Sequence, residues 1–303
     1  MAMVVNVGSV SLLNDTLRDV NSVQEQLGTL QTQISSGNVA QTFQQLNGSV
    51  ENYSSINARI NSTQQYQTSN AETVSSLQTT DEAMGQMIDL VSDMTTLIQG
   101  RLNTATGQSA PFDQEMKDDL SSLATLMNTQ YNGRYLFSGT ASNQPTMPST
   151  TVQPATDGVP DTSYYGGSSQ STQVGIDQGV TMEYPVRGDD PAFQQIYAAI
   201  QQSLKASDAN DTSGLNASLT LLQQGSSGLI AARAKVNAAT VNVQNTDDRL
   251  TQMQTYWQGL SDKVGKTDIV AASTQVASYE AILQATYQVY ARLSQLRLSD
   301  YLR

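Results

Sequence analysis

The chain has 303 residues and a net charge of −12, with 15 Lys and Arg against 27 Asp and Glu. Such an acidic surface repels nucleic acid and anionic lipid, so we expect neither as a partner. The sequence contains no Cys and no His, which excludes disulfides, the usual zinc sites, and Ser–His or Cys–His catalysis. Because only 38% of the residues are hydrophobic, a thick globular core and an ordinary metabolic enzyme are both disfavoured.

The chain contains no apolar run near the roughly 18–20 residues that span a bilayer. Its first segment, Met1 to Leu13, is mildly apolar but is interrupted by polar residues, and the first basic residue is Arg18. A positively charged region ahead of an apolar stretch is the mark of a cleaved secretory signal. We therefore expect neither membrane insertion nor a cleaved signal.

Proline divides the sequence into three parts. All seven prolines lie between Pro111 and Pro191. Since a proline inside a helix costs about 3 kcal/mol, this distribution predicts long helical arms on both sides of a different middle.

The first arm carries apolar residues at alternating steps of three and four, the spacing of a coiled-coil seam. The glycine at position 37 is expected to end this helix. The seam consists of Val20, Val23, Leu27, Leu30 and Ile34.

A second proline-free helix is predicted over about 49–100, and a shorter one over 113–130. Both show the same alternating steps. In the longer helix the seam is Leu77, Thr80, Met84, Met87, Val91, Met94 and Ile98, and in the shorter one it is Met116, Leu120, Leu123 and Met127.

The middle of the chain, 136–190, has the character of a small β-rich insert. Alternation of apolar and polar residues predicts a half-buried strand through Val180, Met182, Tyr184 and Val186. The stretches Tyr164-Tyr165-Gly166-Gly167 and Asp157-Gly158 predict turns. A short helix through Phe193, Ile196, Ile200 and Leu204 is expected to follow.

Two further helices are predicted after the insert. One runs over about 214–264, with Gly225 and Gly228 as the places where it is expected to bend. The last begins at a cap formed by Thr267 and Asp268. Its seam is Ile269, Ala272, Val276, Tyr279, Leu283, Thr286, Tyr290 and Leu293.

The pattern as a whole predicts a mainly α fold, a long coiled-coil helical bundle with a small β-rich insert. We expect three parts: terminal helices at 1–45 and 265–303, a helical hairpin core at 46–135 and 191–264, and the insert at 136–190. The seams of the terminal helices are thin and rich in Ala, Thr and Gln. Since helical stability comes mainly from packing an apolar face, we expect the two ends to be poorly ordered alone and to fold on assembly.

The candidate assembly interface follows from those two thin seams. We predict that it consists of Val20, Val23, Leu27, Leu30, Ile34, Val276, Tyr279, Leu283, Tyr290 and Leu293.

Nothing in the sequence predicts a catalytic, cofactor or metal site. Neighbouring acids on a helix point about 100° apart and do not converge on a substrate, so the pairs are interpreted as solvated faces or caps: Asp81-Glu82, Asp118-Asp119, Asp189-Asp190 and Asp247-Asp248. The stretch 208–214 superficially looks like a calcium loop, but Ser213 and Leu219 stand where an EF-hand needs Gly and Glu. We interpret it as a loop that caps the next helix, and Trp257 as a core residue.

Several segments resemble a known family. Leu27–Gly37, LGTLQTQISSG, is similar to the end of the first helix in the flagellin superfamily. Arg134–Thr140, RYLFSGT, resembles the strand after the third helix in the hook–filament junction protein of bacterial flagella, the hook-associated protein 3 family. Thr267-Asp268-Ile269 and the ending at 293–302, LSQLRLSDYL, resemble the same family's carboxyl end. The likeness covers 1–140 and 190–303, and the loop at 38–46 departs from the family's pattern.

The resemblance implies a flagellin-like structural protein rather than an enzyme, with no cofactor. Such a subunit is exported through the flagellar type III apparatus, is extracellular, and joins hook to filament. Its implied partners are copies of itself, the hook-side junction subunit, flagellin, and an export chaperone at the carboxyl end. The terminal helices would form an inner tube, the hairpin the next layer, and the insert the outward-facing part. A filament flagellin, or a secreted type III coiled-coil tip protein, remains as an alternative.

Overall fold

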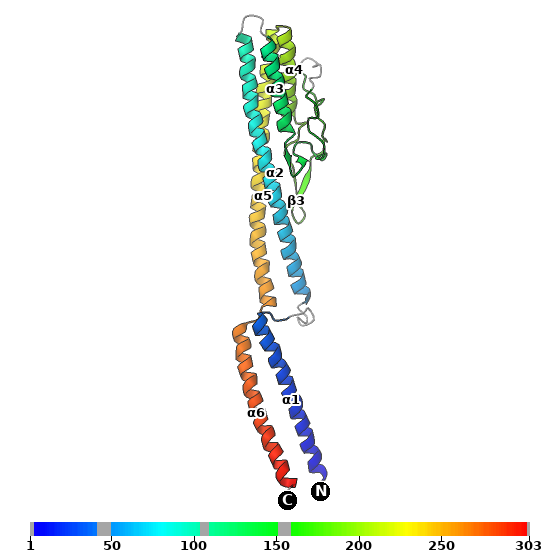
Figure 1. The fold of residues 1–303 in the computed structure, drawn as a ribbon, viewed down its shortest axis with the longest axis vertical. Helices are drawn as coiled ribbons and strands as arrows, with labels where there is room; N and C mark the ends of the chain where they lie inside the picture. Colours follow the sequence, from blue (N-terminus) through cyan, green and yellow to red (C-terminus); the bar gives the residue numbers. More distant parts are fainter. Residues whose placement is uncertain (1–2, 41–49, 104–108, 151–158, 302–303) are drawn as a thin grey trace. The chain divides into compact units, whose positions relative to one another are not determined.

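The computed structural model describes residues 3–40, 50–103, 109–150 and 159–301. Within them the chain is mainly helical (Figure 1). The helices are α1 (Met3–Ser36), α2 (Val50–Asn103), α3 (Ser109–Met127), α4 (Pro191–Asp208), α5 (Thr212–Gly265) and α6 (Ile269–Tyr301). The strands are β1 (Gln130–Tyr131), β2 (Arg134–Tyr135), β3 (Gln173–Asp177) and β4 (Val180–Glu183).

The chain divides into two compact units. The terminal unit consists of Met1–Asn61 and Gln254–Arg303. The central unit is Ser62–Met253.

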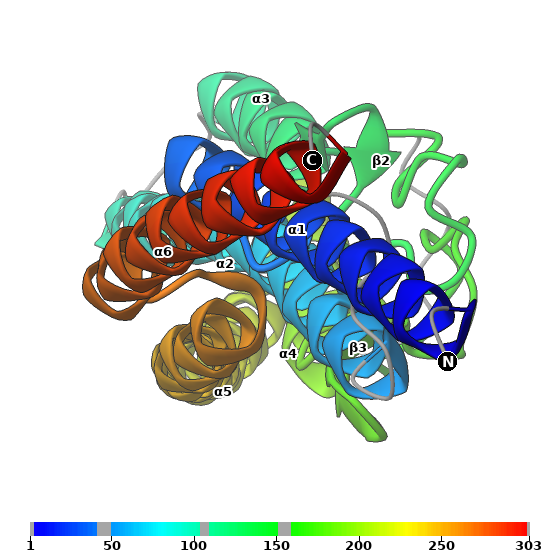
Figure 2. The same cartoon turned by 90° about the horizontal axis from the view of Figure 1, so that it is seen from below.

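In the terminal unit, α1 and α6 pack against each other as an antiparallel pair, side by side in both views (Figure 1 and Figure 2). Gly37 ends α1 with a φ of 72°, the left-handed conformation that glycine adopts without a Cβ penalty. The segment that follows α1 pairs with the segment that precedes α6, since Val39 N donates to Gly265 O at 2.9 Å and Thr267 N donates to Gly37 O at 3.0 Å. The predicted helix stop at Gly37 is confirmed.

The cap of α6 is also as predicted. Asp268 Oδ1 accepts hydrogen bonds from the backbone N–H groups of Val270 and Ala271, each at 3.0 Å. A carboxylate in this position satisfies N–H groups that have no partner inside the helix. Thus a local sequence signal alone located this helix start.

Trp257, near the end of α5, is half-buried rather than enclosed in a core, so the core interpretation was wrong. The guanidinium carbon of Arg59 lies 4.9 Å from the centre of its ring, and Tyr256 meets it edge-on at 5.1 Å. The reason is geometric: a long charged side chain covers one face of the indole and keeps its own head in water.

The core of the central unit lies between α2, α3, α4 and α5. Every seam residue predicted for the second arm is buried there, as are the four predicted for the shorter helix. Thus the three-and-four spacing identified these buried faces correctly. The shorter helix ends at Met127 instead of 130, because the chain turns directly into the tight hairpin of β1 and β2.

Gly225 and Gly228 serve close packing, and the prediction that α5 bends there is wrong, since the helix is continuous through both. A Cβ on Gly225 would lie 2.6 Å from Ile196 Cγ1, and one on Gly228 would lie 2.8 Å from Ala192 Cβ. Both partners belong to α4. Two glycines one turn apart therefore let α4 approach the backbone of α5.

The described strands form two small antiparallel hairpins: the hairpin of β1 and β2 directly precedes the predicted insert at 136–190, and the hairpin of β3 and β4 lies within it (Figure 1). Asn132 and Gly133 both have positive φ, 50° and 75°, as the two-residue turn between β1 and β2 requires. Strand β4 ends at Glu183, so the predicted strand through 186 was too long, and Val180 is 43% exposed because only one face of this hairpin is covered. The turn predicted at 157–158 lies outside the described residues.

The predicted turn at Tyr164 contributes to the core. The Tyr164 ring is buried and packs against Tyr197 of α4, with ring centres 4.8 Å apart. Its hydroxyl donates to Gly188 O at 2.8 Å. Buried tyrosines keep such a partner because an unsatisfied hydroxyl is costly. One aromatic residue thus joins the insert to α4.

Candidate assembly interface

The predicted interface residues of α1 lie on its less exposed side. Val20 and Leu30 are buried, and Val23, Leu27 and Ile34 are half-buried. This is the side expected to face α6, since these two helices are in contact. The seam is shallow, because only two of its five members are buried and both keep some exposure.

The α6 side of the pair is shallower still. Val276, Tyr279, Leu283 and Tyr290 are all half-buried. The side chain of Leu293 lies outside the described part of the chain. The structure therefore brings the two predicted seams into one helix pair. Their contact with neighbouring subunits stays a prediction.

A second apolar set, which sequence reasoning missed, is exposed on α6. Ile282 is 45% exposed and Val289 is 52% exposed. They are seven residues apart, which is two turns, and therefore lie on one face beside the seam. Their spacing of seven residues is the sequence signal that marks this face. Four more aliphatic residues of the terminal unit are also exposed, namely Leu17, Val39, Ile269 and Val270.

Tyr287 links the two terminal helices through a polar contact. Its hydroxyl accepts a hydrogen bond from Gln24 Nε2 at 2.8 Å, while the residue as a whole is half exposed. Pairing between exposed side chains of this kind contributes about 1 kcal/mol. The terminal pair thus relies on thin apolar contact and a few polar contacts.

In the central unit the hairpin of β3 and β4 is held against the long helices by three contacts. Asn70 of α2 is fully buried and donates through Nδ2 to Ile176 O at 3.0 Å. Tyr184 OH donates to Ser76 Oγ at 3.0 Å. Arg249 Nη2 of α5 pairs with Asp177 Oδ2 at 2.7 Å. This set, Asn70, Ser76 and Arg249 with their partners, fixes the insert to α2 and α5.

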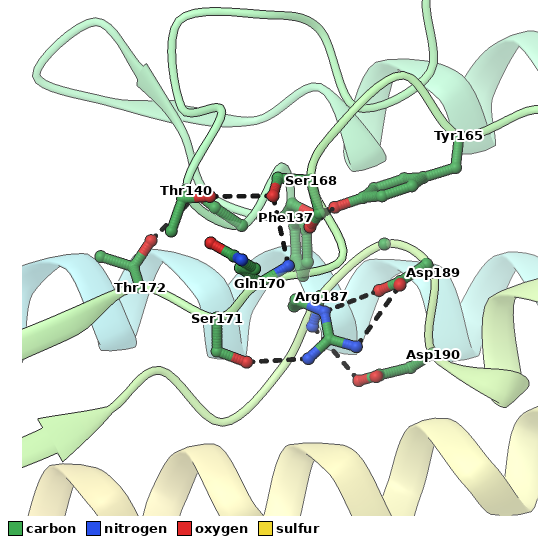
Figure 3. A network of polar contacts seen from close by, with 12 residues as sticks. Phe137, Thr140, Tyr165, Ser168, Gln170, Ser171, Thr172, Arg187, Asp189 and Asp190 are labelled. Atoms are coloured by element: carbon green, nitrogen blue, oxygen red, sulfur yellow. Dashed lines mark hydrogen bonds and ion pairs between the residues drawn. The ribbon is translucent and has the colours of Figure 1, made fainter.

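Arg187 organises the base of the insert (Figure 3). Its Nε donates to Asp189 Oδ1 at 2.8 Å, and its Nη1 donates to Ser171 Oγ at 2.8 Å. Its backbone N donates to Asp190 Oδ2 at 3.2 Å. Asp190 occupies the N-cap position of α4, in line with the predicted cap, whereas the interpretation of Asp189 as a solvated acid is wrong because its carboxylate is paired with Arg187. Burial raises the pKa of Asp190.

Asp81 is likewise paired rather than solvated. Its two carboxylate oxygens accept from Arg233 Nε at 2.8 Å and Nη2 at 3.0 Å, which joins α2 to α5. The hydrogen bond from Arg233 holds the pKa of Asp81 below its usual value, and the bond to Asp81 raises the pKa of Arg233. A bidentate pair of this kind specifies geometry as well as stability.

Asp119 of α3 behaves in the opposite way. Burial, and to a smaller extent the neighbouring carboxylates of Asp93, Glu115 and Asp118, together raise its pKa to about 6. Like charges close together disfavour ionisation. This acid is thus a local source of electrostatic strain at neutral pH.

The loop at 208–214 caps α5, as predicted. Asp211 Oδ1 accepts from Ser213 N at 3.0 Å, and Asp211 O accepts from Leu215 N at 3.1 Å. Over the part of the chain that the structure describes, there is no cluster of three or more acidic side chains placed to hold a metal ion. None of the helices in the same ranges combines the length and apolar character of a membrane-crossing segment.

Comparison with known proteins gives one family and several similar folds. The family described as the bacterial flagellin N-terminal helical region matches residues 9–142. No curated protein matches the chain.

Solved structures similar to this one include three flagellar proteins. A protein described as a flagellar hook-associated protein, from Vibrio parahaemolyticus, has a TM-score of 0.58 at 18% identity, over 72% of this chain and 97% of its own. FlgL from Bacillus cereus has a TM-score of 0.55 at 17% identity, over 67% of this chain and 96% of its own. FlgL from Xanthomonas campestris has a TM-score of 0.52 at 14% identity, over 68% of this chain and 98% of its own. At these identities the likeness establishes a shared fold.

Proposed function

We propose that this flagellin-like flagellar structural protein joins hook to filament and self-associates through its terminal helices. The observation that carries the proposal is the exposed apolar face of α6 formed by Ile282 and Val289. It lies beside a seam that is already used between α1 and α6. A helix pair with apolar residues on two faces is expected to bury the second one against another chain.

The energetics favour assembly as the stabilising step for this pair. Fully burying an Ile or Val side chain contributes about 1.5–3 kcal/mol, and each of these two is about half exposed. Completing their burial therefore adds on the order of 1 kcal/mol each. Repeated on every subunit of a ring, such contacts accumulate, whereas the isolated pair has only its shallow seam.

The junction role in particular is supported by the RYLFSGT motif and the carboxyl-terminal ending, together with the fold shared with hook-associated proteins. A filament subunit is the second candidate, because the matching family is that of flagellin. In the junction role the partners are further copies of this chain, the hook-side subunit and flagellin. An export chaperone at the carboxyl end, and export through the flagellar type III apparatus to the cell exterior, belong to the same proposal.

Deletion of the gene in its source bacterium distinguishes the two roles. For a junction protein we expect intact hooks, no filaments, and unpolymerised flagellin in the medium. Hooks that keep their junction proteins but lack filament protein altogether would identify a filament subunit instead. As a second measurement, the purified chain should not extend into long filaments when seeded, which a filament flagellin does.

Complementation of the deletion strain tests the interface. Ile282→Asp and Val289→Asp place a charge on the exposed apolar face, and each should be exported but not assembled. The matched controls are Gln284→Asp and Gln288→Asp, which introduce the same charge at exposed positions on the other side of α6. Motility by cells with the Ile282→Asp chain, or its loss with the control chains, would contradict this assignment.

A further inference from the structure

The central unit contains a cavity that the assembly role does not use. It has a volume of about 230 Å³ and lies where α2, the hairpin of β1 and β2, and the hairpin of β3 and β4 meet. The residues that give it chemical character are Glu72, Ser76, Tyr131, Arg134, Tyr135 and Tyr184. Two of them, Arg134 and Tyr135, open the RYLFSGT motif, whose later residues Phe137 and Ser138 are buried in the core.

Three tyrosines give the cavity amphipathic walls. Tyr131, Tyr135 and Tyr184 are all half-buried, so each keeps part of its side chain accessible. Tyr184 is held in place by the hydrogen bond from its hydroxyl to Ser76 Oγ at 3.0 Å. Tyrosines offer a flat apolar face and a polar tip at low conformational cost. They therefore suit a ligand with both apolar and hydroxyl-bearing faces.

The charges in the cavity are balanced. Glu72 and Arg134 are both exposed at its wall, and each is the single residue of its sign there. Arg134 Nε donates to Ser142 Oγ at 3.1 Å, which orients the guanidinium along the wall. One acceptor-only group and one donor-only group thus face the same small space. Such a pair fits a neutral ligand that can both donate and accept hydrogen bonds.

Other ligand classes fit less well. A phosphate or a carboxylate would meet Glu72, and the chain's net charge of −12 opposes anions in general. A quaternary ammonium would find aromatic rings and an acid, but it would also meet Arg134. The volume lies below the roughly 300–1,000 Å³ of sites for drug-sized molecules, so the cavity holds one ring rather than a long chain.

We propose that this cavity binds one neutral saccharide ring. The ring's C–H face packs on the tyrosines, and its hydroxyls bond to Glu72 and Arg134. Such a site would attach the protein to a glycan. The inference rests on the cavity alone and is independent of the junction role.

Saturation-transfer NMR on the full chain tests the proposal. The probes are the methyl glycosides of glucose, galactose, mannose and N-acetylglucosamine, with N-acetylneuraminic acid and choline as charged comparisons. At least one neutral glycoside should show transfer, with a dissociation constant on the order of millimolar, since a single small ring makes few contacts. No transfer to any neutral glycoside, or stronger binding of either charged probe, overturns the proposal.

Two variants tie the binding to the cavity. Glu72→Ala and Tyr131→Ala should each weaken the affinity at least tenfold. The matched controls are Glu82→Ala, an exposed Glu on the same helix, and Tyr256→Ala, an exposed Tyr outside the cavity; neither should change it. If Tyr131→Ala does not fold by circular dichroism, Glu72→Ala decides, because an exposed helical Glu tolerates Ala. Equal binding by Glu72→Ala and wild type overturns the assignment.

Discussion

The close approach of α4 to α5 predicts an unusual response to adding one methyl group. In Gly225→Ala, the new Cβ would lie 2.6 Å from Ile196 Cγ1 and 3.1 Å from Ala192 O. Ile196 is fully buried and cannot turn away into solvent. Overpacking of this kind lowers the free energy of unfolding by about 1–3 kcal/mol. Replacing a helical glycine by alanine raises it by about 0.5–1 kcal/mol. We therefore expect Gly225→Ala to be less stable than wild type by up to about 2.5 kcal/mol.

Gly100→Ala is the matched control. Gly100 also lies in a helix, and a Cβ there would meet nothing within 4 Å. This variant should therefore gain about 0.5–1 kcal/mol. The difference between the two variants cancels the helix preference to first order and leaves the crowding term, about 1–3 kcal/mol. For a unit of the size of Ser62–Met253, melting temperature shifts by about 2–4 °C for each kcal/mol.

Urea and thermal unfolding followed by far-ultraviolet circular dichroism measure both variants. Equal slopes of the free energy of unfolding against urea concentration would show that the two variants expose the same surface on unfolding. The reasoning is refuted if Gly225→Ala is as stable as Gly100→Ala. That result would mean that α4 and α5 do not approach as closely as the structure has them.

Three further predictions concern the central unit. Phe137→Ala should lower the free energy of unfolding by about 3–5 kcal/mol in urea titration, because Phe137 is fully buried and meets Phe193 edge-on at 5.8 Å. Asp119 has a folded-state pKa of about 6 against an ordinary 3.8, so the folded state holds the proton more tightly. Stability should therefore fall as pH rises from about 4 to 6, and Asp119→Asn should lose this dependence. Asp81 has a lowered pKa beside Arg233, so its stabilisation is present above about pH 4 and is lost as pH falls. Asp81→Asn should lower the free energy of unfolding by about 1 kcal/mol at pH 7, a small value because the pair is partly exposed. In strong acid the same substitution should leave the free energy of unfolding unchanged.

Each of these has an outcome that contradicts it. If the Phe137→Ala chain is as stable as wild type, the Phe137 ring does not contribute to the core as the structure indicates. An Asp119→Asn chain with the same pH profile as wild type would assign the profile to another acid. An Asp81→Asn chain that stays less stable than wild type at pH 2 would show that packing, not charge pairing with Arg233, accounts for the loss.

The helices and their caps could be predicted from local sequence. The seam from Leu77 to Ile98 is buried as its spacing indicated, and Gly37, Asp211 and Asp268 end or begin helices where their residue types suggested. These signals act within one or two turns. They hold without any information about what packs on the helix, because backbone geometry sets the period and the end groups.

The contacts that hold the insert could not be predicted. Asn70 reaches the backbone of Ile176, which is 106 residues away in sequence. Arg187 Nη1 donates to Ser171 Oγ, which is 16 residues earlier in the sequence, at the base of the insert. Isolated polar residues of these types occur throughout the sequence. No periodicity marks the few that find a partner.

The amino-acid sequence by itself determined the mainly helical character, the apolar side of each long helix, and the absence of cysteine and histidine chemistry. The tertiary structure decided that Gly225 and Gly228 allow close packing, which acids are paired, and which apolar face of α6 remains exposed. The physical reason is the separation along the sequence of the residues that interact. A helix and its apolar side follow from neighbours three or four residues apart, whereas close approach, charge pairing and cavities depend on residues that only the folded chain brings together.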